Sequence, residues 1–429
     1  MPNWSHRSDR SCKSHLSLLV LAATLTACHH PHSPRLPELG YLWQRDWTPA
    51  VLAGFREAEK RTAGVVILGA ELALSPTPHA ARANIPWDAL KGQNVSLALR
   101  VSPYDGPFAD NDAAFQAIAA ETQRLLTLAQ THGVQPREFQ LDFDCAQKKL
   151  PGYAIWVSAL RRLIHPLSLV ITALPSWLGE PAFPVLAQSA DGYVLQVHSV
   201  PTLAETGRAS LCDTTLARKW IARASALGLP FSVSLPAYWC VAGYGPTGSL
   251  LGVAMDSVQP AWPPGTSLLE FASSADDLSN LVASCQRSPP AHLTSLLWYR
   301  LPIPTDRRNW RWPTLAAVMA GRHPAHRIDA ICEPGNPVDI SVVNHGEAEE
   351  RVACTIALTW TGAQVTAGDT LPGWTLSLQN GQAAFSTTPG NLLRLSPGDR
   401  RSIGWLRYDK VTAPRWQVDE QSPPAQPAR

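Results

Sequence analysis

The chain repeats one rhythm between residues 39 and 302, in which a short apolar strand is followed by a segment long enough for a helix. This alternation is typical of parallel βα units. The strand candidates are 39–45, 64–72, 95–102, 138–145, 167–175, 192–200, 230–239 and 295–302. Helical periodicity with capping residues is clearest in 112–131, 151–164, 213–227 and 274–286. Eight such units predict a (β/α)8 TIM barrel over residues 38–325.

A doubly wound sheet is the alternative, but it would need a glycine-rich phosphate turn after the first strand, and WQRDWTP contains no glycine. One insertion interrupts the rhythm between Trp239 and Glu270. It is rich in glycine and proline, so we expect a hairpin over the mouth of the barrel.

From about residue 328 the pattern changes to short alternating β segments separated by turns such as NHGE and QNGQ. This predicts a small antiparallel β-sandwich over 328–418, followed by a disordered tail over 419–429.

The amino-terminal segment has the features of an export signal. Three basic residues precede the apolar run LSLLVLAATLTA, which is too short to span a bilayer and stops at Cys28. The stretch ending at Cys28 resembles the bacterial lipobox, which implies a lipoprotein signal over 1–28, lipidation of Cys28 and a tether over 29–37. His29 stands where an Asp would imply inner-membrane retention, so the resemblance implies the outer membrane, facing the periplasm. An ordinary signal peptide cut nearby is the alternative.

Composition narrows the classes of partner. A net charge of +2 with 16% charged residues gives no basic face, so we expect no nucleic-acid partner. The chain has 16 Trp, whose flat rings suit stacking on sugars but also serve packed cores. Exported proteins can keep disulfides, and we expect one between Cys332 and Cys354, with Cys212 and Cys240 as a second pair. No C-x-x-C spacing indicates zinc.

The fourth strand, EFQLDFDC, carries the most informative polar residues. Strand alternation directs its apolar side chains to the helices and leaves Gln140, Asp142 and Asp144 in the barrel interior. By the same alternation the interior also receives Glu71, Arg100, Gln196, His198, Trp298 and Arg300. The carboxyl ends of the strands are where barrel enzymes build their sites.

Two interpretations of these charges remain open. Asp142 and Glu71 could form a structural ion-pair network with Arg100 and Arg300. Alternatively, two carboxyl groups act on a glycosidic bond. Asp144 lies nearest the rim and is then the first choice for the acid/base, and Asp142 would tune its pKa through like-charge repulsion.

Other residues complete the predicted site. Glu71 would assist the two aspartates, and Arg45, Arg100 and Arg300 would position substrate. Gln196 would bind it, and His198 would orient it or a carboxylate, with an ordinary interior histidine as the alternative. A sugar-stacking floor, with Tyr238 on one wall, would be formed by Trp43, Trp47, Trp177, Trp239 and Trp298, although each of these could instead be ordinary packing.

The segments LDFDC and WYRLP together resemble the chitinase family of glycoside hydrolases. That family carries alternating acids at the end of strand four and a Trp at the end of strand eight. Its pattern continues to a Glu that serves as general acid, and here that position is Ala146. The resemblance therefore implies glycan chemistry in which Asp144 or Glu71 replaces the missing acid, or a protein that is not a hydrolase.

A nearer resemblance is to a bacterial family of predicted lipoproteins known only as a domain of unknown function. It rests on YLWQRDWTPAV, FQLDFDC, ITALPSWL and LLWYRLP. It supports the fold and implies no reaction.

We therefore expect an envelope lipoprotein whose barrel binds and hydrolyses a polysaccharide or glycan, without cofactor or metal. A noncatalytic glycan-binding or envelope-assembly protein is the alternative, and a scaffold with a working β domain is a third. A divalent cation held by the carboxylates also stays open. The sequence leaves the oligomeric state undefined.

Overall fold

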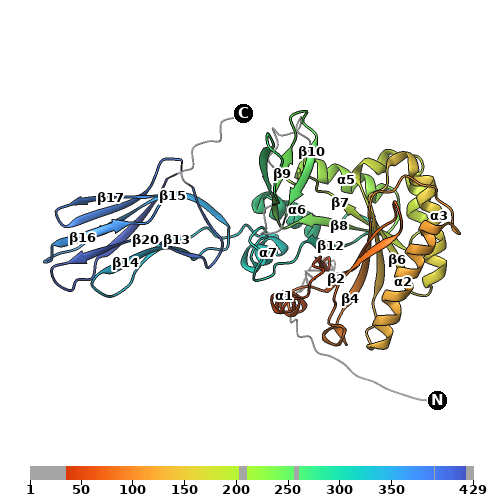
Figure 1. The fold of residues 1–429 in the computed structure, drawn as a ribbon, viewed down its shortest axis with the longest axis horizontal. Coiled ribbons are helices and arrows are strands. Elements are labelled where there is room, and N and C mark those ends of the chain that lie inside the picture. Colours follow the sequence, from red (N-terminus) through yellow and green to blue (C-terminus); the bar gives the residue numbers. More distant parts are fainter. Residues whose placement is uncertain (1–34, 202–209, 256–259, 391, 422–429) are drawn as a thin grey trace, which may run out of the picture. The chain divides into compact units, whose positions relative to one another are not determined.

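The computed structural model describes residues 35–201, 210–255, 260–390 and 392–421 (Figure 1). Eight parallel strands form a closed ring, because β1 pairs with both β2 and β12. In ring order they are β1 (Glu38–Leu42), β2 (Gly64–Ala73), β4 (Val95–Val101), β5 (Glu138–Phe143), β6 (Ser168–Ala173), β7 (Gly192–Gln196), β8 (Phe231–Pro236) and β12 (Leu293–Tyr299). Each coincides with a predicted strand, so the prediction of a TIM barrel is confirmed.

Helices cover the outside of the ring (Figure 1). They are α1 (Pro49–Glu59), α2 (Ala113–Thr131), α3 (Leu150–Ile164), α4 (Phe183–Gln188), α5 (Thr214–Ala226), α6 (Ala275–Arg287) and α7 (Trp312–Met319), with 3-10 turns η1 (Trp87–Leu90), η2 (Gln147–Lys149) and η3 (Pro175–Gly179). The predicted cap residues act as caps: Asp112 accepts from the backbone N–H of Phe115 at 2.7 Å, and Asp213 from that of Thr215 at 2.9 Å.

The barrel strands separate two cores. A large one lies between strands and helices, and a small one fills the barrel interior with Tyr41, Val66, Ala98, Val194 and Leu297. On β5 the alternation is as predicted, since Phe139, Leu141 and Phe143 belong to the outer core.

On β12 the predicted alternation is wrong. Leu297 and Tyr299 contribute to the inner core, whereas Trp298 is fully buried on the helix side, against Trp310, and donates to Glu38 at 2.7 Å. Apolar residues occupy both faces of this strand, so the pattern does not define which side faces inward.

The insertion forms a three-stranded antiparallel sheet rather than a hairpin. We call it the cover sheet; its strands are β9 (Trp239–Tyr244), β10 (Leu250–Ala254) and β11 (Ser267–Ala272), in the order β10-β9-β11. One face is buried through Cys240, Ala242, Tyr244 and Phe271. A further short strand, β3 (His79–Arg82), pairs antiparallel with β2.

The carboxy-terminal residues form two antiparallel sheets around a separate apolar core, as predicted for a β-sandwich. One sheet has the order β13 (Ile328–Cys332), β14 (Val338–Asn344), β20 (Arg400–Tyr408), β16 (Val365–Thr370). The other contains β17 (Trp374–Gln379), β18 (Gln382–Thr387), β15 (Glu350–Thr359), β19 (Leu393–Leu395) and β21 (Arg415–Gln421).

Two expectations about this region change. Residues 419–421 pair with β15 as part of β21, so the start of the predicted disordered tail is wrong, and 422–429 lie outside the described residues. The predicted disulfide is also not formed: Cys332 and Cys354 are free thiols, one in each sheet. Cys212 and Cys240 are free as well.

The predicted signal segment and Cys28 lie outside the described residues. Within the described ranges, no helix has both the length and the apolar character needed to cross a membrane.

Candidate active site

A cavity of about 580 Å³ lies at the carboxyl ends of the barrel strands. We call it the mouth cavity. Its lining comes from seven barrel strands, the loops that follow them and the cover sheet: Tyr41, Trp43, Arg100, Asp142, Asp144, Thr172, Leu174, Gln196, His198, Ser199, Val200, Ser234, Tyr238, Leu250, Val253, Met255 and Tyr299. The mouth is the position at which barrel enzymes carry their active sites.

Arg100 joins the two aspartates of the fourth barrel strand. Its guanidinium donates to Asp142 at 2.7 Å and to Asp144 at 3.3 Å. Asp142 lies opposite Arg100 in the register of β4 and β5, and it also accepts from Thr172 at 2.8 Å and from Gln196 at 3.5 Å. Since its side chain is only 4% exposed, the main role of Asp142 is to accept the hydrogen bonds that hold these three neighbours in place.

Asp144 is placed differently. It follows the end of β5, its side chain is 40% exposed, and Arg100 is its one ion-pair partner among the described residues. Burial, followed by repulsion from Asp142, raises the pKa of Asp144, while Arg100 opposes the shift. A carboxyl group with a raised pKa beside an open cavity is suited to donating a proton.

Aromatic rings line much of the remaining surface. Tyr41 packs edge-on against Trp43, with ring centroids 5.2 Å apart, and Tyr299 lies 5.8 Å from Trp43. His198 stacks on Tyr299 at 5.7 Å and its Nε2 lies 3.3 Å from the Ser234 hydroxyl. Burial lowers the pKa of His198 to about 4, so this ring is neutral near pH 7.

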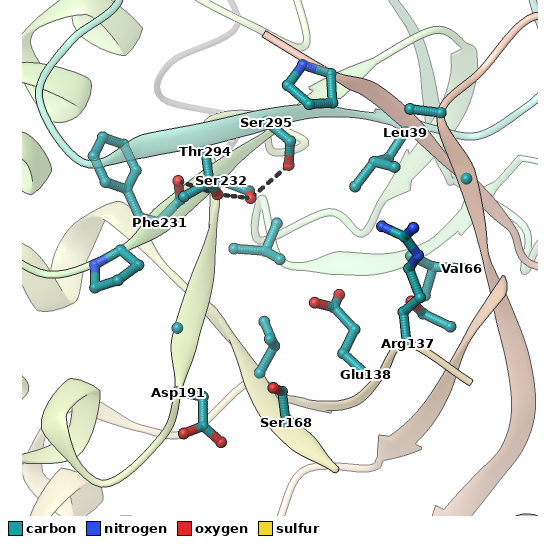
Figure 2. A pocket seen from close by; sticks show the side chains of 18 of the residues that line it. Leu39, Val66, Arg137, Glu138, Ser168, Asp191, Phe231, Ser232, Thr294 and Ser295 are labelled. Atoms are coloured by element: carbon teal, nitrogen blue, oxygen red, sulfur yellow. Dashed lines mark hydrogen bonds between the residues drawn. The ribbon is translucent and has the colours of Figure 1, made fainter. Parts of the chain in front are cut away.

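A chain of hydrogen bonds runs from the mouth cavity to the opposite end of the barrel. The Tyr41 hydroxyl donates to Gln140 at 2.8 Å, and the Gln140 amide donates to Glu138 at 2.7 Å. Glu138 enters a second cavity of about 380 Å³ at the amino ends of the strands (Figure 2).

Several polar groups of this second cavity are held by hydrogen bonds. Ser232 bonds to Thr294 at 2.9 Å and to Ser295 at 2.7 Å (Figure 2). Asp191 accepts from the Leu169 backbone N–H at 2.9 Å. Polar groups at this end of a barrel usually serve stability, so the mouth cavity is the better candidate for chemistry.

The mouth cavity brings together half of the predicted site residues. These residues are Trp43, Arg100, Asp142, Asp144, Gln196, His198 and Tyr238. They include Asp142 of β5 and Asp144, which follows the end of β5.

The structure places the other charged candidates outside the cavity. Arg45 and Glu71 pair with each other at 3.4 Å, and neither of them lines the mouth cavity. Arg300 is buried and pairs with Asp306, because it follows Tyr299 on the outward-facing side.

Four tryptophans predicted at the rim pack elsewhere. Trp47 packs on Phe55 of α1, and Trp177 is buried, donating to the Cys145 carbonyl at 3.1 Å. Trp239 lies 4.0 Å from the Arg394 guanidinium and Trp298 lies in the outer core. None of these four rings lines the mouth cavity.

Sequence reasoning missed several lining residues. Tyr41 could have been found, because it lies two positions before Trp43 and so shares its face. Thr172 and Ser234 lie on apolar strands and give no sequence signal of their own. Tyr299 was not predicted to line the cavity, because the sequence analysis assigned the wrong face of β12 to the barrel interior.

Metal binding finds no support in the mapped parts of the chain, where no group of three or more His, Cys, Asp or Glu side chains is arranged to hold an ion.

Residues 97–304 match the model of a family described as Domain of unknown function (DUF3142). The predicted resemblance to a family of unknown function is confirmed for this stretch, which holds most of the mouth cavity. No curated protein matches the chain.

The solved structures to which the chain is similar include the following three. The spore cortex-lytic enzyme SleL of Bacillus cereus is 10% identical, with a TM-score of 0.44 over 67% of this chain and 74% of that one. The chitinase ChiA74 of Bacillus thuringiensis is 8% identical, with a TM-score of 0.41 over 90% and 100% of the two chains. The GH18 chitinase ChiB of Flavobacterium johnsoniae is 10% identical, with a TM-score of 0.42 over 67% and 93%. The functional argument therefore rests on the residues of the mouth cavity.

Proposed function

We propose that the mouth cavity binds a glycan and that Asp144 protonates the glycosidic oxygen during hydrolysis. The observation that carries this proposal is the half-exposed Asp144 carboxyl, whose pKa is raised, in a cavity lined by aromatic rings. Aromatic faces stack on the apolar faces of sugars, and convergent polar groups fix their hydroxyls.

The environment of Asp144 suits an acid that must lose its proton. Burial and Asp142 favour the protonated form before the reaction. Once the proton passes to the leaving oxygen and the C–O bond breaks, the Arg100 guanidinium, 3.3 Å away, stabilises the carboxylate that remains. Water supplies the hydroxyl group of the new reducing end, and its remaining proton restores the protonated form of Asp144.

Among the residues that the structure describes, no second carboxylate is available to attack the sugar. Glycosidases usually use two carboxyl groups about 5–5.5 Å or 6.5–9.5 Å apart across the scissile bond. Here Asp142 is enclosed by Arg100 and Thr172, and Glu71 pairs with Arg45 and does not line the cavity. With these two carboxylates set aside, the attacking group in this proposal is a water molecule or a group of the substrate itself.

One observation favours a second candidate function, glycan binding without turnover. Ala146, at the position where the chitinase pattern has its Glu, caps η2 and brings no acid to the cavity. If Asp144 serves only to hold Arg100, the protein would bind sugar and leave it intact.

Hydrolysis of a glycan panel by the protein, by Asp144→Asn and by the control Asp88→Asn separates the two functions. Asp88 is exposed and lies outside the cavity. We expect turnover in the wild type and the control, and a loss of at least about 100-fold in Asp144→Asn. Equal turnover in all three removes Asp144 from catalysis, and binding without turnover supports the second function.

We also propose that the protein is anchored in the cell envelope through a lipid on Cys28, as the lipobox-like sequence supports. Detergent-phase partitioning of the protein and of Cys28→Ser tests this. Partitioning of both proteins into the aqueous phase would contradict it.

A further inference from the structure

The two walls of the mouth cavity differ in chemistry. Strands β4 to β7 supply Arg100, Asp142, Thr172 and Gln196, which are charged or hydrogen-bonding. The cover sheet and the residue that follows β10 supply Leu250, Val253 and Met255, which have no polar side-chain atom able to bind a hydroxyl strongly. A ligand that fills this cavity meets a polar surface on one side and an aliphatic surface on the other.

A β-bulge directs this aliphatic wall into the cavity. Leu250 pairs with Tyr244 and Val253 pairs with Ala242, although Leu250 and Val253 are three residues apart. The bulge at Leu251 adds one residue, so both side chains share the face on which Tyr244 and Ala242 are buried.

The other face of the cover sheet is closed by a tryptophan. Gly243 and Gly252 lie opposite each other there, and the Trp262 ring packs over both, so closely that a Cβ on Gly243 would lie 2.5 Å from it. The absence of side chains at these glycines makes room for the ring. The cover sheet thus has one face under Trp262 and one face toward the cavity.

Leu250 remains 50% exposed although it lines a cavity. Exposed aliphatic surface inside a binding site is stabilised only when an apolar group covers it. A sugar hydroxyl in that position would lose its hydrogen bonds to water without replacement.

We infer that the substrate of this site is an amphiphile, in which the sugar that Asp144 acts on carries an alkyl or acyl chain that lies on Leu250 and Val253. This inference rests on the proposed function and specifies its substrate class as a glycolipid-like glycoside. The polar wall with Asp144 holds the sugar, and the cover sheet holds the chain.

Matched glycosides test the inference. Methyl and octyl β-D-glucopyranosides, and methyl and octyl N-acetyl-β-D-glucosaminides, are titrated below the critical micelle concentration, with binding followed by calorimetry. We expect the octyl member of at least one pair to bind about tenfold more tightly or better, the gain that burial of about two methylene groups supplies. Equal affinity within both pairs, including no binding by any member, overturns the inference.

Two neighbouring leucines provide the variant and its control. Leu250→Ser should reduce the octyl gain to less than about threefold, because the chain loses its contact. Leu251→Ser should keep the gain, since Leu251 is 48% exposed, close to Leu250, but does not line the cavity. Val253→Ser serves as a second variant if Leu250→Ser unfolds, as judged by circular dichroism. An octyl gain that survives both Leu250→Ser and Val253→Ser contradicts the inference.

These results separate the inference from the proposed function. Turnover that depends on Asp144 but not on chain length would overturn the amphiphile and keep the hydrolase. A chain-length effect on binding, without turnover, would overturn the hydrolase and keep the amphiphile.

Discussion

Asp142 and Asp144 both line the mouth cavity and share one guanidinium, that of Arg100, yet the Asp142 side chain is 4% exposed and that of Asp144 is 40% exposed. The two residues are separated by Phe143, so both are directed inward, but Asp142 is still within β5 and Asp144 lies beyond its end. This difference in depth assigns them different roles. Asp142 orients Arg100 and repels the charge of Asp144, and Asp144 is accessible to a ligand.

Asp142→Asn should move the pH profile of hydrolysis to lower pH. Repulsion from Asp142 raises the pKa of Asp144, so its removal lowers that pKa. The protonated acid is the active form, and the rate falls as pH rises through the pKa of Asp144. The measurement is kcat/KM against pH for both proteins, and an unchanged descending limb would contradict the role given to Asp144.

Asp142→Ala should be more destabilising than Asp144→Ala. The first substitution leaves Arg100 and Thr172 without their buried acceptor, which costs about 2–4 kcal/mol of unfolding free energy. The second removes a half-exposed ion pair and should cost less than about 1 kcal/mol. Urea unfolding of both variants measures the difference, and equal costs would show that Asp142 is not the structural partner.

Substitutions on β12 test which of its side chains face the cavity. Trp298→Ala should lower the free energy of unfolding by about 3–5 kcal/mol, because the ring is fully buried and binds Glu38. Tyr299→Ala should instead weaken glycan binding with a smaller loss of stability. Thermal unfolding and ligand titration of both variants decide this, and the reverse pattern would mean that Trp298 faces the ligand.

His198 should make stability depend on pH in the acid range. Its pKa is lowered from 6.5 to about 4 in the folded chain, so the unfolded chain binds more protons between these values. This contribution is present above pH 6.5 and is lost as pH falls to about 4. His198→Gln should show a smaller loss of stability across this window, which urea unfolding at a series of pH values measures. Parallel curves for the two proteins would exclude His198 as the cause.

The fold was predictable because its signal repeats. Every barrel strand is a short apolar run bounded by turn residues, and an error at one end does not alter the count of eight. The face of β5 was also predictable, because charged residues alternate there with Phe and Leu. On β12 the sequence LLWY is apolar throughout, and only the register against β1 and β8 defines the inner face.

The tryptophans were harder to place, since their positions depend on loops. Trp177 and Trp239 both follow barrel strands. Trp177 lies in η3 and is buried, whereas the ring of Trp239 packs against the guanidinium groups of Arg308 and Arg394. The cover-sheet wall was hidden for a different reason. The bulge at Leu251 inserts one extra residue and so changes which side chains share a face. A prediction from strict alternation assumes that a strand contains no bulge.

The pairing of β1 with β12 also determines when this protein can fold. Glu38 lies beside Leu296, so the first barrel strand lacks one of its neighbours until the chain has been synthesised through β12. Until then the growing sheet has two open edges, which readily pair with other chains. A chain cut short before Tyr299 should therefore aggregate rather than form a smaller barrel, and the barrel closes only when the chain extends through β12.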